Sequence, residues 1–164
     1  MTSDRDGEAE DLKITVLTVG KPKDRCLAEL AERYLSRMRP FAPVALESVA
    51  ESRDLQPERK IDQEGEAITR ALRDRDFVVV LDEKGTGLDS VSLSNWLENT
   101  MKEEPGRIVF VIGGAFGLSE RVMRRSAFSL SLSAMTLPHE LCLVFFLEQL
   151  YRAFSIIKGT KYHH

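Results

Sequence analysis

Hydrophobic residues fall into two patterns along this chain, and the two patterns alternate. Runs rich in apolar and β-branched residues, which predict buried strands, cover 13–20, 44–49, 76–82, 107–114 and 128–132. Between and after these runs, apolar residues recur at helical spacing, which predicts helices over 24–39, 57–73, 93–101, 119–125 and 138–157. Strict alternation of strands and helices is typical of a parallel sheet with helices on both faces.

The residues at the borders of these segments support the same α/β class. Asp24 is a candidate N-cap for the first helix, and Ser90 or Ser92 for the third. The segment 83–89, which contains two glycines, is predicted to be a loop. Because no repeat or low-complexity linker interrupts the pattern, we expect a single domain over residues 13–164.

The helix predicted at 138–157 is apolar on almost every side. A helix of this kind is buried on most sides. In a chain of this size, that favours a second subunit covering one side, and the usual arrangement is a homodimer with twofold symmetry. The alternative, a central core helix within a monomer, stays open.

Composition narrows the class of protein. The chain has 164 residues, of which 43% are hydrophobic and 30% charged, as expected for a globular domain that needs no disulfide or metal. Its longest apolar stretch, 141–147, is too short to cross a bilayer, and its N-terminus lacks the apolar part of a signal peptide. Cys26 and Cys142 lie far apart, and no zinc-binding spacing is present. We therefore expect a cytoplasmic protein with no membrane partner and no metal.

Charge is unevenly distributed along the chain. The formal net charge is −3, which by itself argues against a nucleic-acid partner. Residues 1–11, however, carry five acidic side chains against Arg5 alone, so this segment holds −4 and the rest of the chain +1. Having almost no large apolar side chain, residues 1–12 are expected to form a mobile acidic extension. The near-neutral remainder is a weak electrostatic binder of nucleic acid.

Candidate ligand-binding segments follow three of the predicted strands. Ligands of parallel α/β sheets bind at the carboxyl ends of the strands, and here those positions are the loop after residues 81–82, the segment 112–117 and the segment 131–139. Glycines stand at 113, 114 and 117. They indicate either a tight turn that needs positive φ or a close approach of the backbone to a ligand.

Catalytic side chains are less obvious. Asp82 and Glu83 are adjacent strand residues and would face opposite ways. His139, at the start of the last helix, suits a structural role as well as a catalytic one. Tyr162 and His163 stand beside lysine near the C-terminus, where chains are often frayed. An aromatic ring, an imidazole and a lysine nevertheless suit stacking on a base and contact with phosphate.

Six segments of the chain form a series that points to a family. They are ITVLTVGKPK (14–23), VLDEKG (80–85), IGGAFGLSE (112–120), SLSAMTLPH (131–139), EQLYRAFSI (148–156) and KYHH (161–164). In this order and spacing they resemble the RlmH family, small SPOUT-class methyltransferases that act on bacterial 23S ribosomal RNA. The resemblance covers essentially all of residues 13–164.

The resemblance implies a fold and a cofactor. The α/β sheet would be followed by a C-terminal segment threaded into a deep trefoil knot, a topology that is otherwise almost absent from proteins. The knot would bind S-adenosylmethionine. By position, the residues lining that site would be Leu81, Gly113, Leu132, Ser133, Ala134, Met135, Thr136 and Leu137.

The resemblance also implies a reaction and its partners. The reaction would be methyl transfer to N3 of a pseudouridine in helix 69 of 23S rRNA, within the assembled ribosome. The active protein would be a homodimer in which one subunit's tail completes the other's site. His163 would be the candidate general base, Tyr162 would stack on or orient the base, and Arg152 would bind phosphate or fix the tail.

Two positions depart from the family pattern, and two other functions stay open. Leu143 and His164 stand where family members often carry basic residues, so positive charge near the expected RNA face would be lost. One alternative is a SPOUT methyltransferase with another RNA target, although the chain has no room for an added RNA-binding domain. The other is a catalytically silent RNA-binding dimer associated with the ribosome. Binding of S-adenosylmethionine discriminates this second alternative from an enzyme.

Overall fold

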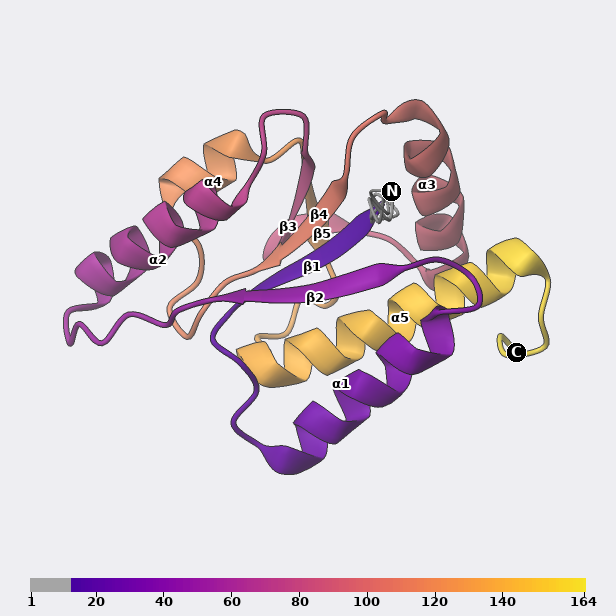
Figure 1. Ribbon diagram of the computed structural model, residues 1–164, viewed down its shortest axis with the longest axis horizontal. Coiled ribbons are helices and arrows are strands. Elements are labelled where there is room, and N and C mark those ends of the chain that lie inside the picture. Colours follow the sequence, from indigo (N-terminus) through magenta and orange to yellow (C-terminus); the bar gives the residue numbers. More distant parts are fainter. Residues whose placement is uncertain (1–12) are drawn as a thin grey trace, which may run out of the picture.

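A five-stranded parallel sheet forms the centre of the molecule (Figure 1). The computed structural model describes residues 13–164, so the extension expected at 1–12 lies outside the described residues. The strand order is β2-β1-β4-β3-β5, and every pairing is parallel. The predicted parallel α/β class is therefore confirmed. The strands are β1 (Ile14–Val19), β2 (Val44–Val49), β3 (Phe77–Gly87), β4 (Ile108–Ile112) and β5 (Phe128–Ser131).

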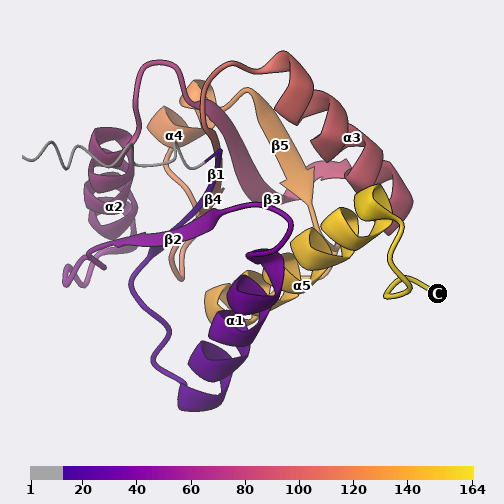
Figure 2. The same ribbon diagram turned by 45° about the vertical axis from the view of Figure 1, so that its right-hand side comes forward.

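Helices cover both faces of this sheet, as Figures 1 and 2 show. One face carries α1, α3 and α5, and the other carries α2 and α4. Successive strand residues point to opposite faces, so Phe110 joins the larger core while its neighbours Val109 and Val111 join the smaller one. The helices are α1 (Arg25–Met38), α2 (Pro57–Ala71), α3 (Ser90–Glu103), α4 (Glu120–Arg125) and α5 (His139–Lys158).

The apolar helix α5 is partly a core helix and partly an uncovered one. It packs between α1 and α3, and the ring centroids of Phe146 and Phe110 lie 4.7 Å apart. On its outer side, however, Leu141 is 42% exposed and Phe145 is 40% exposed. These two side chains are four residues apart and share one face of the helix. Most of the helix is therefore a core helix within one chain, and one side is left uncovered. That a second subunit covers this side stays a prediction.

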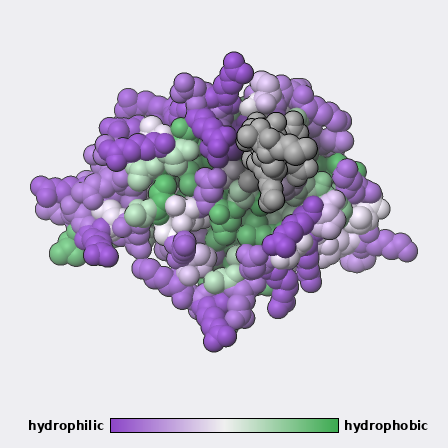
Figure 3. Space-filling model, in the orientation of Figure 1, coloured by the Kyte–Doolittle hydropathy of each residue, from purple (hydrophilic) through white to green (hydrophobic). Residues whose placement is uncertain are grey.

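Figure 3 shows hydrophobic side chains gathered across the middle of this face of the molecule, bordered by hydrophilic ones. None of the helices within residues 13–164 is long and apolar enough to cross a membrane.

Two local predictions were wrong. The segment from residue 83 is not a loop, because β3 continues to Gly87 after a shift of register between Leu81 and Thr86 opposite β5. The N-cap of α3 is Asp89 and not a serine, since its carboxylate accepts a hydrogen bond of 2.7 Å from the Ser92 N–H. Asp24 caps α1 as predicted, accepting from the Leu27 N–H at 3.1 Å.

A buried ion pair lies at the amino ends of β3 and β4. The Asp76 side chain is 2% exposed and accepts two hydrogen bonds from the Arg107 guanidinium, at 2.8 and 3.1 Å. It also accepts from the Arg73 N–H at 2.8 Å. Burial alone would raise the pKa of the Asp76 carboxyl, but these hydrogen bonds outweigh it and hold the pKa below its usual value.

Replacing Asp76 with asparagine should lower the free energy of unfolding at pH 7 by about 3 kcal/mol, because it removes the carboxylate that balances a buried guanidinium. Since the native pKa lies below the unfolded value of about 3.9, the carboxylate's contribution is present at neutral pH and is lost in acid. The difference in the free energy of unfolding between wild type and variant should therefore narrow as the pH falls below about 4. Urea unfolding across this range, with the exposed Asp74→Asn as control, measures it. A gap that is small at pH 7 or independent of pH contradicts this account.

Candidate active site

The three segments expected to bind a cofactor meet at one edge of the sheet. β4, β3 and β5 are neighbours in that order, and their carboxyl ends lie together. Gly113 directly follows β4, Leu81 lies where the register of β3 shifts, and 132–137 directly follows β5. Segments that are up to 56 residues apart in sequence are thus brought to the edge at which ligands of such sheets bind.

Side-chain hydrogen bonds connect the part of β3 where the register shifts to the residues at the end of β5 and after it. The Ser131 hydroxyl donates to the Glu83 carbonyl oxygen at 3.1 Å. The Thr136 hydroxyl donates to Glu83 Oε2 at 2.8 Å. Glu83 therefore holds the 132–137 segment from both ends. This role of Glu83 was not predicted, since nothing in the sequence near residue 83 shows that Thr136 lies beside it.

The glycine turn after β4 satisfies both interpretations of its glycines. Gly117 has φ +89° and its N–H donates to the Gly114 carbonyl oxygen at 3.1 Å, which is the tight turn. Gly113 instead lies in a close approach, because a Cβ added there would be 2.9 Å from the carbonyl carbon and oxygen of Gly117. The turn is therefore compact, and at its glycines it presents backbone atoms without side chains to this edge of the sheet.

These features fit a bound adenosine. Leu81, Leu132 and Leu137 are half-buried and offer apolar contact to a ring. Within residues 133–137, the backbone N–H of Met135 donates to the Ser133 hydroxyl, and the other N–H groups have no partner in the described part of the chain. Unpaired backbone groups can bind the polar edge of a base. The residues present thus suit S-adenosylmethionine.

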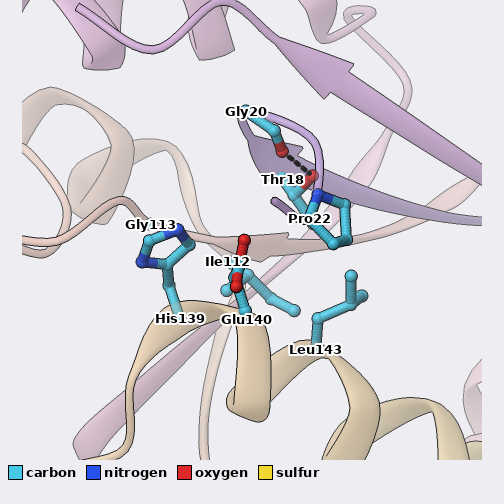
Figure 4. Close-up of a pocket in the computed structure, with 8 residues that line it drawn as sticks. All are labelled: Thr18, Gly20, Pro22, Ile112, Gly113, His139, Glu140 and Leu143. Atoms are coloured by element: carbon cyan, nitrogen blue, oxygen red, sulfur yellow. Dashed lines mark hydrogen bonds between the residues drawn. The ribbon is translucent and has the colours of Figure 1, made fainter. Parts of the chain in front are cut away.

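A small pocket adjoins Gly113 on the side of β1 (Figure 4). His139 and Glu140 enter it from the first turn of α5, opposite the end of β4. The N-cap of α5 is Pro138, and within residues 13–164 the His139 imidazole has no hydrogen-bond partner. A hydrogen-bonded capping role for His139 is therefore not supported. The lining residues are Thr18, Gly20, Pro22, Ile112, Gly113, His139, Glu140 and Leu143.

The three candidate catalytic residues lie together at the other end of α5. After the helix ends at Gly159, with φ +70°, the chain turns back onto its last turns. Glu148 Oε1 accepts hydrogen bonds from Arg152, at 2.6 and 3.1 Å, and from the Tyr162 hydroxyl at 3.0 Å. Arg152 Nη1 is 3.2 Å from Nδ1 of His163. Position near the C-terminus favoured a frayed end for Tyr162 and His163, but in the structure they belong to a defined cluster with Arg152 and Glu148.

The contacts of Tyr162 indicate an anchor for the tail. Its ring centroid lies 4.6 Å from that of Tyr151, and the Arg152 guanidinium lies 4.9 Å from it. Burial, with hydrogen bonds involving Tyr34 and Glu148, raises the pKa of Tyr162 to about 12, so its hydroxyl stays protonated at neutral pH. In this arrangement the hydroxyl and ring are engaged within the chain, whereas His163 is exposed.

Glu148 at the centre of this cluster was also missed. Its side chain is 20% exposed, and its second oxygen accepts from the Gln149 amide at 2.7 Å. In the sequence it only marks the end of an apolar stretch. Its partner Tyr162 is 14 residues away and returns to it only because the chain reverses at Gly159.

Within one chain, the two halves of the candidate site are far apart. Arg152 is thirteen residues beyond His139 on α5, or roughly 20 Å along the helix axis. Figure 1 shows the tail at the opposite end of α5 from the turns after β4 and β5. The tail of one chain therefore lies far from Gly113 of the same chain in this conformation.

Solved structures share this architecture. The chain superposes on a probable methyltransferase from Bordetella pertussis with a TM-score of 0.55 and 14% identity, covering 87% of this chain and 94% of that one. It also superposes on a probable methylase family protein from Haemophilus influenzae with a TM-score of 0.54 and 16% identity, covering 93% and 70%. The fold is thus that of an α/β class that includes these proteins.

The family follows from sequence comparison. The model of the family described as "Predicted SPOUT methyltransferase" matches residues 12–163. Two proteins named ribosomal RNA large subunit methyltransferase H are similar to 93% of this chain, over 99% of their own lengths: 35% identical in Parabacteroides distasonis and 38% in Carboxydothermus hydrogenoformans. The chain belongs to the SPOUT methyltransferase family.

Proposed function

We propose that this protein is an S-adenosylmethionine-dependent methyltransferase of large-subunit ribosomal RNA. The observation that carries the proposal is the meeting of Leu81, Gly113 and 132–137 at one sheet edge. It occurs in a chain that matches, over nearly its whole length, proteins named for this activity. We further propose that the segment 132–164 completes a trefoil knot around this edge, as the family resemblance implies.

The proposed acceptor is N3 of a pseudouridine in helix 69 of 23S rRNA, within the assembled ribosome in the cytoplasm. Residues 13–164 form one sheet covered by helices, and outside residues 1–11 the net charge is +1. Such a protein binds free RNA weakly. A shaped ribosomal surface supplies the recognition that charge does not.

The proposed chemistry divides between the two halves of the site. S-adenosylmethionine, when bound, supplies an electrophilic methyl group. The backbone at Gly113 and 133–137 holds and orients the cofactor, and the apolar side chains exclude water. His163 accepts the proton from N3 of the base on Nδ1, which first leaves the Arg152 guanidinium because that group can only donate. Tyr162 and Arg152, both bonded to Glu148, position His163, so of the two roles expected for Arg152 its contacts support fixing the tail.

A homodimer brings these halves together. The 20 Å between them along α5 is bridged when a second subunit lays its own α5 alongside in the opposite direction. The exposed pair Leu141 and Phe145 gives such a partner an apolar surface. Each tail then reaches the cofactor edge of the other subunit, and the dimer has two composite sites.

The departures from the family pattern bear little on this proposal. Leu143 was expected near the RNA face. It is instead 2% exposed and packs in the larger core. His164 is exposed beside His163 and does leave the tail with less charge. No observation favours a silent binding protein or another RNA target over the proposed enzyme.

Methyl transfer in a purified system tests the proposal. The protein is mixed with S-adenosylmethionine labelled in the methyl group and with ribosomes from a strain that lacks the protein. We expect label in 23S rRNA of assembled ribosomes and little in free 23S rRNA. Absence of label from both substrates, with protein that is folded and binds the cofactor, would contradict an enzymatic function and favour a silent binding protein.

A further inference from the structure

Helix α2 lies directly against the glycine turn that follows β4. A Cβ added to Gly65 of α2 would be 2.1 Å from the Ser119 hydroxyl oxygen. A Cβ added to Gly114 would be 2.6 Å from Glu64 Oε2. Both neighbours are side chains: the backbone of α2 at Gly65 packs against Ser119, and the backbone of the turn at Gly114 packs against the Glu64 carboxylate. The turn therefore rests on the Glu64 side chain.

Glu64 is an unusual residue to find at this contact. It belongs to a helix with many charged residues, yet it is 3% exposed. A buried carboxylate is stable only when it is paired or hydrogen-bonded. Its Oε1 accepts from the Ser52 N–H at 3.1 Å and lies 3.8 Å from the Lys60 ammonium. Its other oxygen is the one that faces Gly114.

Lys60 connects Glu64 to a longer series of charged contacts. Its ammonium is 3.0 Å from Glu51 Oε1 and donates to the Ser52 carbonyl oxygen at 2.9 Å. The second oxygen of Glu51 is 3.0 Å from the Lys23 ammonium. These hydrogen bonds lower the pKa of Glu51 and raise that of Lys60, so both stay charged at neutral pH.

The series ends at α5. The backbone N–H of Lys23 donates to Glu140, which lies in the first turn of that helix beside His139. The segment 132–137 leads directly into the same turn. The charged series thus runs from the glycine turn on one side of the candidate cofactor site to the start of α5 on the other.

We propose that Glu64 is a positioning residue for the cofactor, holding the Gly113–Gly117 turn in its binding shape from behind. The inference rests on the proposed cofactor site. Glu64 does not touch the ligand. It fixes Gly114, and through it Gly113, while Lys60 and Ser52 hold its carboxylate in place. A turn that is free to shift would bind the cofactor less tightly, because part of the binding free energy would be spent on ordering it.

Calorimetric titration with S-adenosylmethionine tests this role. Glu64→Gln keeps the size of the side chain and removes the charge that Lys60 holds. We expect the Kd to rise about tenfold. The matched control is Glu66→Gln on the same helix, whose exposed carboxylate pairs with Arg70 and should leave the Kd unchanged. In methylation assays, the KM for the cofactor should rise with the Kd while the KM for ribosomes stays constant.

Thermal unfolding of the cofactor-free proteins separates positioning from stability. A purely structural role would lower the melting temperature of Glu64→Gln and leave its Kd within twofold of wild type, and that result overturns the inference. If Glu64→Gln does not fold, Lys60→Met takes its place, with a threefold or larger rise in Kd expected and an unchanged Kd overturning the inference. Failure of the wild type itself to bind would instead contradict the proposed cofactor site.

Discussion

Replacing His163 with alanine should slow methyl transfer about a hundredfold or more, the contribution typical of a positioned general base. The imidazole is exposed and oriented by Arg152 at 3.2 Å, so it is the group of the tail cluster that is presented outward. Glu148 still holds Arg152 and Tyr162 in the variant, so the fold of the tail should persist. Cofactor affinity should not change.

The neighbouring His164→Ala serves as the matched control for this variant. It removes the same side chain one residue later, where the structure shows an exposed residue. Single-turnover rates with labelled cofactor and ribosomes measure both. A His163→Ala protein that methylates at the wild-type rate would show that proton removal does not depend on this imidazole.

Mixed dimers should recover activity that neither parent variant has. Gly113→Val should abolish cofactor binding, because even a Cβ there would lie 2.9 Å from the Gly117 carbonyl group. His163→Ala disables the tail. In a dimer of one chain of each kind, the intact cofactor edge of the His163→Ala chain meets the intact tail of the Gly113→Val chain. One site of two is then complete, and about half the wild-type activity is expected.

Two different N-terminal tags allow the mixed dimers to be isolated, and light scattering confirms their mass. Each variant alone should show only residual methyl transfer. Mixed dimers that stay inactive, although their mass is that of a dimer, would mean that each chain uses its own tail. The two halves of the site, roughly 20 Å apart along α5 within a chain, would then have to meet by a large movement of the tail.

Much of the fold was predictable because it depends on local patterns. Every predicted strand and helix exists, since runs of β-branched residues and helical periodicity report burial directly. The extension of β3 through 83–87 was not predictable. Its glycines and charged residues are typical of a loop, and only pairing with β5 makes them a strand. The N-cap of α3 is Asp89, one residue before Ser90 and three before Ser92, because Asp and Ser both suit this position.

The site divides in the same way. Chain order and the parallel sheet are enough to place Gly113 and 132–137 at one edge. The supporting residues are different, because Glu64, Glu83 and Glu148 each look like solvent-exposed charges in the sequence. Their partners Gly114, Thr136 and Tyr162 lie between 14 and 53 residues away, and only the fold brings them together.

The proposed reaction is methylation of N3 of a pseudouridine in helix 69 of 23S rRNA. Mass spectrometry of the helix 69 fragment, from a strain lacking the protein and from the same strain with the gene restored, tests it most directly. We expect the fragment to lose the mass of one methyl group in the deletion strain and to regain it with the wild-type gene, but not with His163→Ala. A fragment that keeps its methylated pseudouridine in the deletion strain would contradict the claim.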